Sequence, residues 1–143
     1  MSPAQETYSS SPHPLRRLDR FRPLVRDRWR EADTPGAGVW HDLGPHLIDQ
    51  ALALFGEPSG VMADLAILRP GGKACDYAHA VLRYPDKRVI LHADMLSADP
   101  DPRFVVQGSR AAFVTHGLDP QEDQLKATGG AGGEGWGVVD PVA

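Results

Sequence analysis

The segment on which the rest of this 143-residue sequence is built reads Gly36-Ala37-Gly38-Val39-Trp40-His41-Asp42-Leu43-Gly44-Pro45-His46-Leu47-Ile48-Asp49. Apolar residues at helical spacing continue to Phe55, and Gly56 with Pro58 predicts the end of a helix there. Pro45 is expected near the helix start, because its missing N–H costs least in the first turn. Asp42 then falls at or just inside the N-terminus, where the helix dipole favours a carboxylate.

Three ionisable side chains of this segment, Asp42, His46 and Asp49, are separated by four and three residues. Residues at these offsets are neighbours on a helix surface, so they are expected on one face, opposite the apolar stripe. Asp42 and His46 suit a catalytic pair, since histidine exchanges protons near neutral pH and a carboxylate stabilises the imidazolium. From spacing alone, the favoured interpretation is that Asp42 caps the helix and His46 is a surface residue, because helix caps and polar pairs at this spacing are common.

The period changes from helical to two after Pro58, which predicts β-structure. The expected strands are residues 61–68, 77–84, 88–96, 103–107 and 111–116, and residues 18–22 are a further short candidate. Short turns between most of them indicate an antiparallel, meandering sheet. The sequence therefore predicts an α+β fold, an open and mainly antiparallel sheet with one principal helix packed on it.

The length predicts a single domain with its own core. We expect a disordered leader over residues 1–14, the α+β domain over 15–126, and a glycine-rich flexible tail over 127–143. Gly130 to Gly135 matches G-x-G-x-x-G, but no strand precedes it and too few residues follow to form a helix and a second strand. A dinucleotide site is therefore not expected there.

The composition is that of an ordinary globular protein, with 41% hydrophobic and 24% charged residues. Cys75 is the only cysteine, and no apolar run is long enough for a membrane span, so we expect a cytoplasmic protein without a membrane partner. The basic run from Arg16 to Arg30 could bind phosphate or nucleic acid. The favoured interpretation is that these arginines are solvated or pair with Asp19, Asp27, Glu31 and Asp33, and no nucleic-acid partner is expected.

A metal site can be drawn from the acids and histidines Asp42, His46, Asp49, His41, His79 and His92. The H-E-x-x-H spacing of a zinc helix is missing, and His79 and His92 fall on separate predicted strands. No native metal is therefore expected from this set.

The sequence of residues 36–49 nevertheless closely resembles the G-x-G-x-x-x-D-x-G-x-H-x-x-D signature of the Gfo/Idh/MocA family of NAD(P)-dependent sugar and polyol oxidoreductases. Further matching motifs follow in the family's order: Phe21-Arg22-Pro23, Arg28-Trp29-Arg30-Glu31, Arg83-Tyr84-Pro85, Val106-Gln107-Gly108-Ser109 and Gly117-Leu118-Asp119-Pro120-Gln121-Glu122-Asp123-Gln124-Leu125. The likeness covers about residues 17 to 126 and is greatest to the branch with scyllo-inositol-type dehydrogenases.

The resemblance implies a C-terminal, substrate-side domain whose open sheet also makes subunit contacts in a homo-oligomer. It implies that His46 is the acid/base, that Asp42 orients it, and that Asp49 supports it or contacts substrate. NAD or NADP would be the cofactor of the complete enzyme. The family's Rossmann domain and its Glu-Lys-Pro lysine have no match here, since Lys73, Lys87 and Lys126 fit nothing in that pattern. The chain alone is therefore expected to bind no cofactor.

The expected function is that of a truncated C-terminal domain of an NAD(P)-dependent polyol or sugar oxidoreductase, inactive by itself. Its expected partners are a small polyol or sugar and a Rossmann domain supplied in cis or in trans. The alternative is a non-enzymatic dimerisation or interaction domain in which the Asp42 and His46 pair is vestigial.

Overall fold

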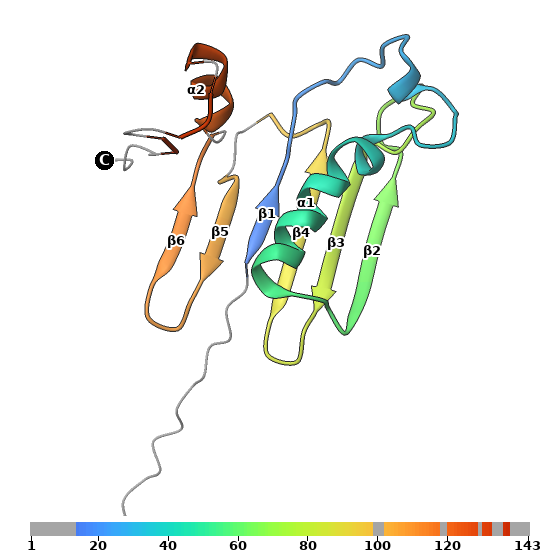
Figure 1. Cartoon of the computed structure of the whole chain (residues 1–143). Coiled ribbons are helices and arrows are strands. Elements are labelled where there is room, and N and C mark those ends of the chain that lie inside the picture. The colour runs from blue at the N-terminus through green and yellow to red at the C-terminus, as the bar shows by residue number, and fades with distance from the viewer. Residues whose placement is uncertain (1–13, 99–101, 118–119, 129, 133–135, 138–143) are drawn as a thin grey trace, which may run out of the picture.

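The computed structural model describes residues 14–98, 102–117, 120–128, 130–132 and 136–137 of the chain. Six strands form one sheet in the order β2-β3-β4-β1-β5-β6 (Figure 1). They are β1 (Leu15–Arg17), β2 (Gly60–Ala66), β3 (Tyr77–Arg83), β4 (Arg88–Asp94), β5 (Phe104–Gln107) and β6 (Ala112–Thr115). Helix α1 (Val39–Phe55) lies across one face, α2 (Gln121–Thr128) lies beyond the end of β6, and a 3-10 turn, η1, spans Trp29–Glu31.

The predicted fold class is confirmed, because this is an α+β domain with an open, mainly antiparallel sheet and one principal helix packed on it. The parallel pair is β1 with β4, and every other neighbouring pair of strands is antiparallel. Neither α-helix of the described residues is long and apolar enough to cross a membrane.

The first strand was predicted in the wrong place. It is Leu15–Arg17 rather than residues 18–22, and it lies between β4 and β5, so the sheet is not a simple meander. Residues 18–22 still follow β4, because Leu18 N–H donates to the His92 carbonyl and Arg20 N–H to the Asp94 carbonyl. Pairing with the β5 side stops at Arg17, whose N–H donates to the Arg103 carbonyl. After Arg17, the described backbone hydrogen bonds of this segment go to the β4 side and not to β5.

The helix start also differs from the expectation. The helix begins at Val39 with Gly38 as its N-cap, so Pro45 lies inside it. Asp42 lies in the first turn, just inside the N-terminus as predicted, but it does not cap the helix. Gly38 has φ +97°, and a Cβ at this position would lie 2.9 Å from the Cys75 carbonyl oxygen. Glycine is required because the backbone takes a left-handed conformation in direct contact with the β2–β3 loop. Val39 N–H donates to that same carbonyl at 2.7 Å, which fixes the start of α1.

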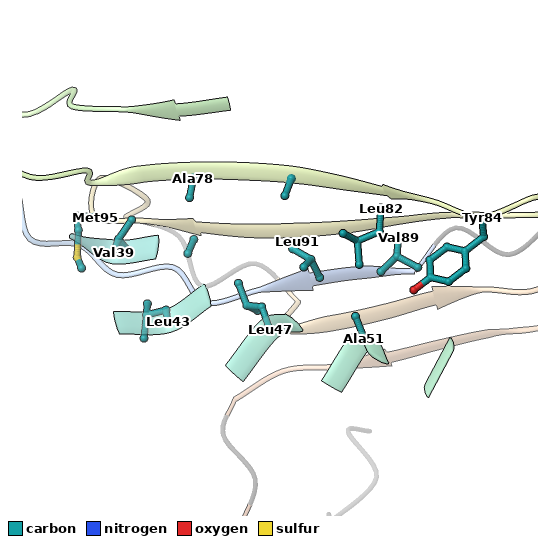
Figure 2. Close-up of a cluster of buried hydrophobic side chains, with 12 residues drawn as sticks. Val39, Leu43, Leu47, Ala51, Ala78, Leu82, Tyr84, Val89, Leu91 and Met95 are labelled. Carbon is teal, nitrogen blue, oxygen red and sulfur yellow. The ribbon is translucent and has the colours of Figure 1, made fainter. Parts of the chain in front are cut away.

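Alternation along the strands places one apolar set under α1. Figure 2 shows Leu43, Leu47 and Ala51 of the helix facing this set. The residues of the core that the sheet contributes are Ala78, Ala80, Leu82, Val89, Leu91 and Ala93. Tyr84 closes the far end, since its hydroxyl donates to the Gly56 carbonyl at 2.8 Å. The apolar period of residues 43–55 was thus read correctly.

Leu47 is the central contact between α1 and the sheet, and it is fully buried. Leu47→Ala should lower the free energy of unfolding by about 2–5 kcal/mol, because apolar contacts are lost and a cavity remains. Leu54→Ala on the same helix is the matched control, since Leu54 is 59% exposed and should change stability by less than about 0.5 kcal/mol. Urea unfolding followed by circular dichroism measures both values. Equal losses in the two variants would show that α1 does not pack through Leu47.

A buried ionic network joins the loop before α1 to the β2–β3 loop. Arg69 Nε lies 2.9 Å from Asp76 Oδ2, and Arg69 Nη1 lies 3.1 Å from Glu31 Oε2. Arg69 Nη1 also donates to the Arg22 carbonyl at 2.9 Å. The segment holding Arg20 and Arg30 is therefore fixed against the loop on which α1 begins.

Glu31 makes this network sensitive to acid. Burial opposes its ionisation, but hydrogen bonds from Arg26 N–H and the Arg28 side chain, with the charge of Arg69, hold the pKa of Glu31 below its usual value. A lowered folded-state pKa gives stability that is full above the unfolded pKa, near 4.5, and is lost as the pH falls through the folded value. Glu31→Gln should therefore flatten the fall in unfolding free energy below about pH 5. Urea titrations at several pH values measure it, and an unchanged slope would contradict this origin.

Two further differences concern the ends of the domain. Pro14, assigned to the leader, is buried, and its carbonyl accepts a hydrogen bond from Ile90 N–H. Helix α2 was not predicted and extends two residues past the expected domain end at residue 126. Residues 1–13 of the expected leader and most of the expected tail lie outside the described residues.

Candidate functional site

A cavity of about 620 Å³ opens between α1, the segment that follows β1, and the start of β5. Helix α1 contributes Leu43, His46 and Gln50, which lie on one face of the helix at spacings of three and four residues. The rest of the lining is Arg16, Arg17, Leu18, Asp19, Arg20, Arg103, Gly117 and Glu122. His46 is the candidate site residue that lies at this cavity.

His46 is exposed at the cavity, and no hydrogen bond or ion pair in the described part of the chain occupies its ring. Each of the two carboxylates of the cavity has one oxygen paired with a basic side chain. Arg17 Nε donates to Asp19 Oδ2 at 2.6 Å, and Lys126 Nζ lies 2.7 Å from Glu122 Oε1. Among the described residues of the lining, His46 is therefore the group best placed to exchange a proton with a bound molecule near neutral pH.

Arginines dominate the charge of the cavity. The Arg16 Nε atom is buried without a hydrogen-bond partner in the described residues, and its guanidinium lies 5.4 Å from the centre of the Phe104 ring. Burial, and then the charge of Arg103, lowers the pKa of Arg16 to about 10, so it stays charged at neutral pH. Guanidinium groups donate hydrogen bonds and accept none. The cavity therefore offers donors that suit hydroxyl or carbonyl oxygens.

Asp42 lies in the first turn of α1 and is paired with two arginines. Its Oδ1 is 3.1 Å from Arg30 Nε, and its Oδ2 is 3.6 Å from Arg20 Nη1. No hydrogen bond or ion pair within the described residues joins it to His46, so an orienting role for Asp42 remains a prediction. Arg20 lines the cavity and Asp42 does not, so in this structure Asp42 is linked to the cavity lining through its ion pair with Arg20.

Asp49 is exposed on α1, and Gln50 rather than Asp49 accompanies His46 at the cavity. Gln50 was missed from the sequence, although its place four residues after His46 carried the signal. Arg16 and Arg103 were missed for another reason: they meet through β1–β5 pairing, which no local pattern reveals.

The basic run is used mainly for ion pairs. Arg28 Nε donates to Glu31 at 2.6 Å, and Arg17 pairs with Asp19. Pairing with these two acids was predicted and is confirmed, whereas Arg30 and Arg20 pair with Asp42 instead. A polyanion surface is not needed to explain these arginines.

The residues considered for a metal do not come together as one site. His41 Nδ1 lies 3.0 Å from the Ala37 carbonyl, on the helix, while His79 and His92 lie on the opposite face of the sheet from α1. Their Nδ1 atoms are 3.2 Å apart. His92 belongs to another cluster, described below.

The sequence of this chain matches a known domain family and several oxidoreductases. The model of the GFO/IDH/MocA C-terminal domain matches residues 16–114. The chain is 56% identical over 120 residues to the uncharacterised oxidoreductase YdgJ of Escherichia coli, covering 84% of this chain and 35% of that protein. It is 37% identical over 123 residues to the scyllo-inositol 2-dehydrogenase (NADP(+)) IolW of Bacillus subtilis, covering 86% and 34%.

Solved structures show the same fold. An oxidoreductase from Yersinia pestis superposes with a TM-score of 0.74 at 46% identity, over 90% of this chain and 36% of that one. One from Klebsiella pneumoniae superposes with a TM-score of 0.75, also at 46% identity, over 92% and 37%. The chain thus spans about a third of the length of the curated relatives it matches.

Proposed function

Because this chain belongs to the Gfo/Idh/MocA family of oxidoreductases, through its C-terminal domain, we propose that it supplies the substrate-side half of an NAD(P)-dependent polyol or sugar oxidoreductase. The observation that carries the proposal is the cavity that His46 lines together with several arginines, with no hydrogen bond or ion pair to the His46 ring among the described residues. The named activity of the Bacillus relative supports an inositol-type polyol as the substrate class and NADP as one cofactor candidate.

The described residues are not suited to hold the dinucleotide. Its usual cradle is a glycine-rich turn between a strand and a helix in a parallel βαβ unit. The one parallel pair of the sheet, β1 with β4, is connected through α1 and two antiparallel strands and contains no such turn. We assign dinucleotide binding to a Rossmann domain outside these residues, acting in cis or in trans.

The residues of this chain would act on the hydroxyl side of the substrate. In an alcohol oxidation the cofactor accepts the hydride, and a base must take the hydroxyl proton as the carbonyl forms. His46 would take that proton, and Arg16 would donate hydrogen bonds to substrate oxygens, since both residues line the cavity. Asp42 would position Arg20 and support the imidazolium charge from one turn away. Asp49 remains a weaker candidate for substrate contact.

The single cysteine, Cys75, is unpaired, which agrees with the reducing cytoplasm as the proposed location. Its thiol has a raised pKa because it is partly buried, so it is not an activated nucleophile. Redox chemistry through this residue forms no part of the proposal.

Complementation tests the function. The 143-residue chain alone should show no polyol-dependent reduction of NADP. Mixing it with the part of the Bacillus relative that it does not match should produce such reduction, because binding geometry is then complete. Full activity of the chain alone would overturn the proposal that cofactor binding requires a separate Rossmann domain. A tight complex of the two parts without turnover on any polyol would overturn the assignment of the cavity.

A second candidate, a dimerisation domain, is favoured by one observation. The face of the sheet opposite α1 carries a row of aliphatic side chains, one from each strand, whose residues are paired in register across the sheet. In sheet order they are Met62, Val81, Ile90, Leu15, Val105 and Val114. Met62 is 69% exposed and Val114 is 45% exposed.

We propose this face as the contact between two copies. Sedimentation of wild type and Val81→Asp tests it, since a charge there should give monomers. A stable dimer that no partner renders active would favour the interaction domain over the enzyme half.

A further inference from the structure

A buried cluster of two carboxylates and one imidazole lies on the same face as the aliphatic row, opposite His46. Strand β4 brings His92 and Asp94 to this face, because residues two apart share a side of the sheet. Asp19 follows β1 and reaches the same place. The exposed fractions of the three side chains are 7% for Asp19, 10% for His92 and 12% for Asp94.

Both carboxylates converge on a single nitrogen. His92 Nε2 is 3.3 Å from Asp94 Oδ2 and 3.6 Å from Asp19 Oδ1, and the three atoms all lie within 4.8 Å of one another. Separations of this size are what ligand atoms have around one ion when each bond is about 2.0–2.2 Å. The three groups are therefore already gathered at coordination distance.

The Asp19 carboxylate supplies an independent sign of a missing partner. Its Oδ2 accepts from Arg17 Nε at 2.6 Å, but its Oδ1 is buried and has no hydrogen-bond donor among the described residues. A buried carboxylate oxygen without a donor is costly. A cation between Asp19, His92 and Asp94 would remove this cost.

The surrounding contacts hold the ligands in place. Asp94 Oδ1 accepts from the backbone N–H groups of Leu96 and Ser97, and Asp94 Oδ2 accepts from Ser97 Oγ at 2.8 Å. His92 Nδ1 is 3.2 Å from His79 Nδ1. This contact orients the His92 ring through its Nδ1, so that its Nε2 points at the two carboxylates.

We propose that Asp19, His92 and Asp94 bind a divalent transition-metal ion, with Zn²⁺ as the preferred ion. One imidazole with two carboxylates suits Zn²⁺ and its first-row neighbours, whereas Ca²⁺ and Mg²⁺ favour oxygen ligands alone. The positive charge of Arg17 beside Asp19 weakens the site, as does the limit of three protein ligands. Affinity is therefore lower than at a closed four-ligand zinc site. The alternative to a metal ion is a proton on His92 Nε2 that is shared with the two carboxylates.

Metal titration distinguishes the two occupants. The 143-residue chain is stripped with a chelator and titrated with ZnCl₂ by calorimetry, and with CoCl₂ by visible absorption. One equivalent should bind, and saturation should raise the melting temperature. Asp19→Asn should weaken binding at least tenfold, because it removes one charged ligand, while the control Asp64→Asn should bind as wild type does. Asp64 is an exposed carboxylate on the same face, in register with His79.

A measurement on the unmutated chain covers the case in which Asp19→Asn does not fold. Two-dimensional ¹H–¹⁵N spectra of the imidazole rings should show the His92 Nε2 resonance moving on addition of one equivalent of Zn²⁺, while the His46 resonances stay unchanged. Absence of saturable binding would leave the proton as the occupant and overturn the metal site. Binding that Asp19→Asn retains, or that moves His46 instead of His92, would overturn it equally. Asp19 also lines the His46 cavity, but zinc binding is measured without turnover, so these results do not depend on the proposed oxidoreductase function.

Discussion

His46→Ala is expected to lower kcat of the reconstituted enzyme by about 10²–10⁴-fold, the usual contribution of a positioned general base. The reconstituted enzyme is this chain joined in trans by the unmatched part of the Bacillus relative. The reason lies in the cavity: its arginines cannot accept a proton, and the carboxylates of Asp19 and Glu122 are each held by a basic side chain. His46 is the remaining lining group that can take a hydroxyl proton.

The effect should fall on kcat and spare KM, because the proton moves in the transition state. His41→Ala is the matched control: His41 is exposed on the same helix, and its ring contacts the Ala37 carbonyl rather than the cavity. Polyol-dependent NADPH formation measures both variants. Equal rates for the two variants would show that His46 takes no part in proton transfer, and a rise in KM alone would make it a binding residue.

Asp76→Ala should have the largest effect on stability, lowering the free energy of unfolding by about 3–5 kcal/mol. Asp76 is completely buried, and it accepts hydrogen bonds from the Leu68 and Arg69 backbone N–H groups as well as from Arg69 Nε. Alanine would leave the Arg69 guanidinium, itself only 3% exposed, with Glu31 as its remaining charged partner. Removing one member of a buried ionic group costs more than the attraction itself, because a charge is left in a poorly solvated place.

Unfolding in urea measures this loss. Asp64→Ala is the control, because Asp64 lies exposed on β2, and its replacement should change the midpoint little. Asp76→Asn should fall between the two, since the amide keeps one acceptor oxygen for the backbone. A loss below about 1 kcal/mol for Asp76→Ala would mean that water or another group solvates Arg69.

Much of the fold follows from apolar periodicity alone. Residues 43–55 read as an amphipathic helix, and the strands after Pro58 read as alternating segments, because both periods persist over several turns or residues. The three residues of β1 are too few to carry a period, and their place between β4 and β5 depends on long-range pairing. Pro45 also misled the prediction, since the helix starts earlier, where Gly38 meets the β2–β3 loop.

In the candidate site, too, features that are local in sequence could be predicted, and those that depend on long-range pairing could not. His46 could be singled out through the spacing and the family motif, because both are local in sequence. The cavity around it could not, since Arg16 and Arg103 come from different strands. Spacing placed Asp42 near His46 but did not reveal its pairing with Arg30 and Arg20, which fold back from the loop before the helix. The Asp19, His92 and Asp94 cluster likewise forms where two strands run side by side.

A covalent chimera tests the proposed enzyme half most directly. Residues 14–128 of this chain would replace the matching third of the Bacillus relative, and scyllo-inositol-dependent formation of NADPH would be followed in the fused protein. We predict turnover on the order of 1 per second, the low end of ordinary enzymes, and its loss on His46→Ala. A folded chimera that binds NADPH yet oxidises no polyol, or that works equally well with alanine at position 46, would contradict the assignment of this cavity as a substrate site.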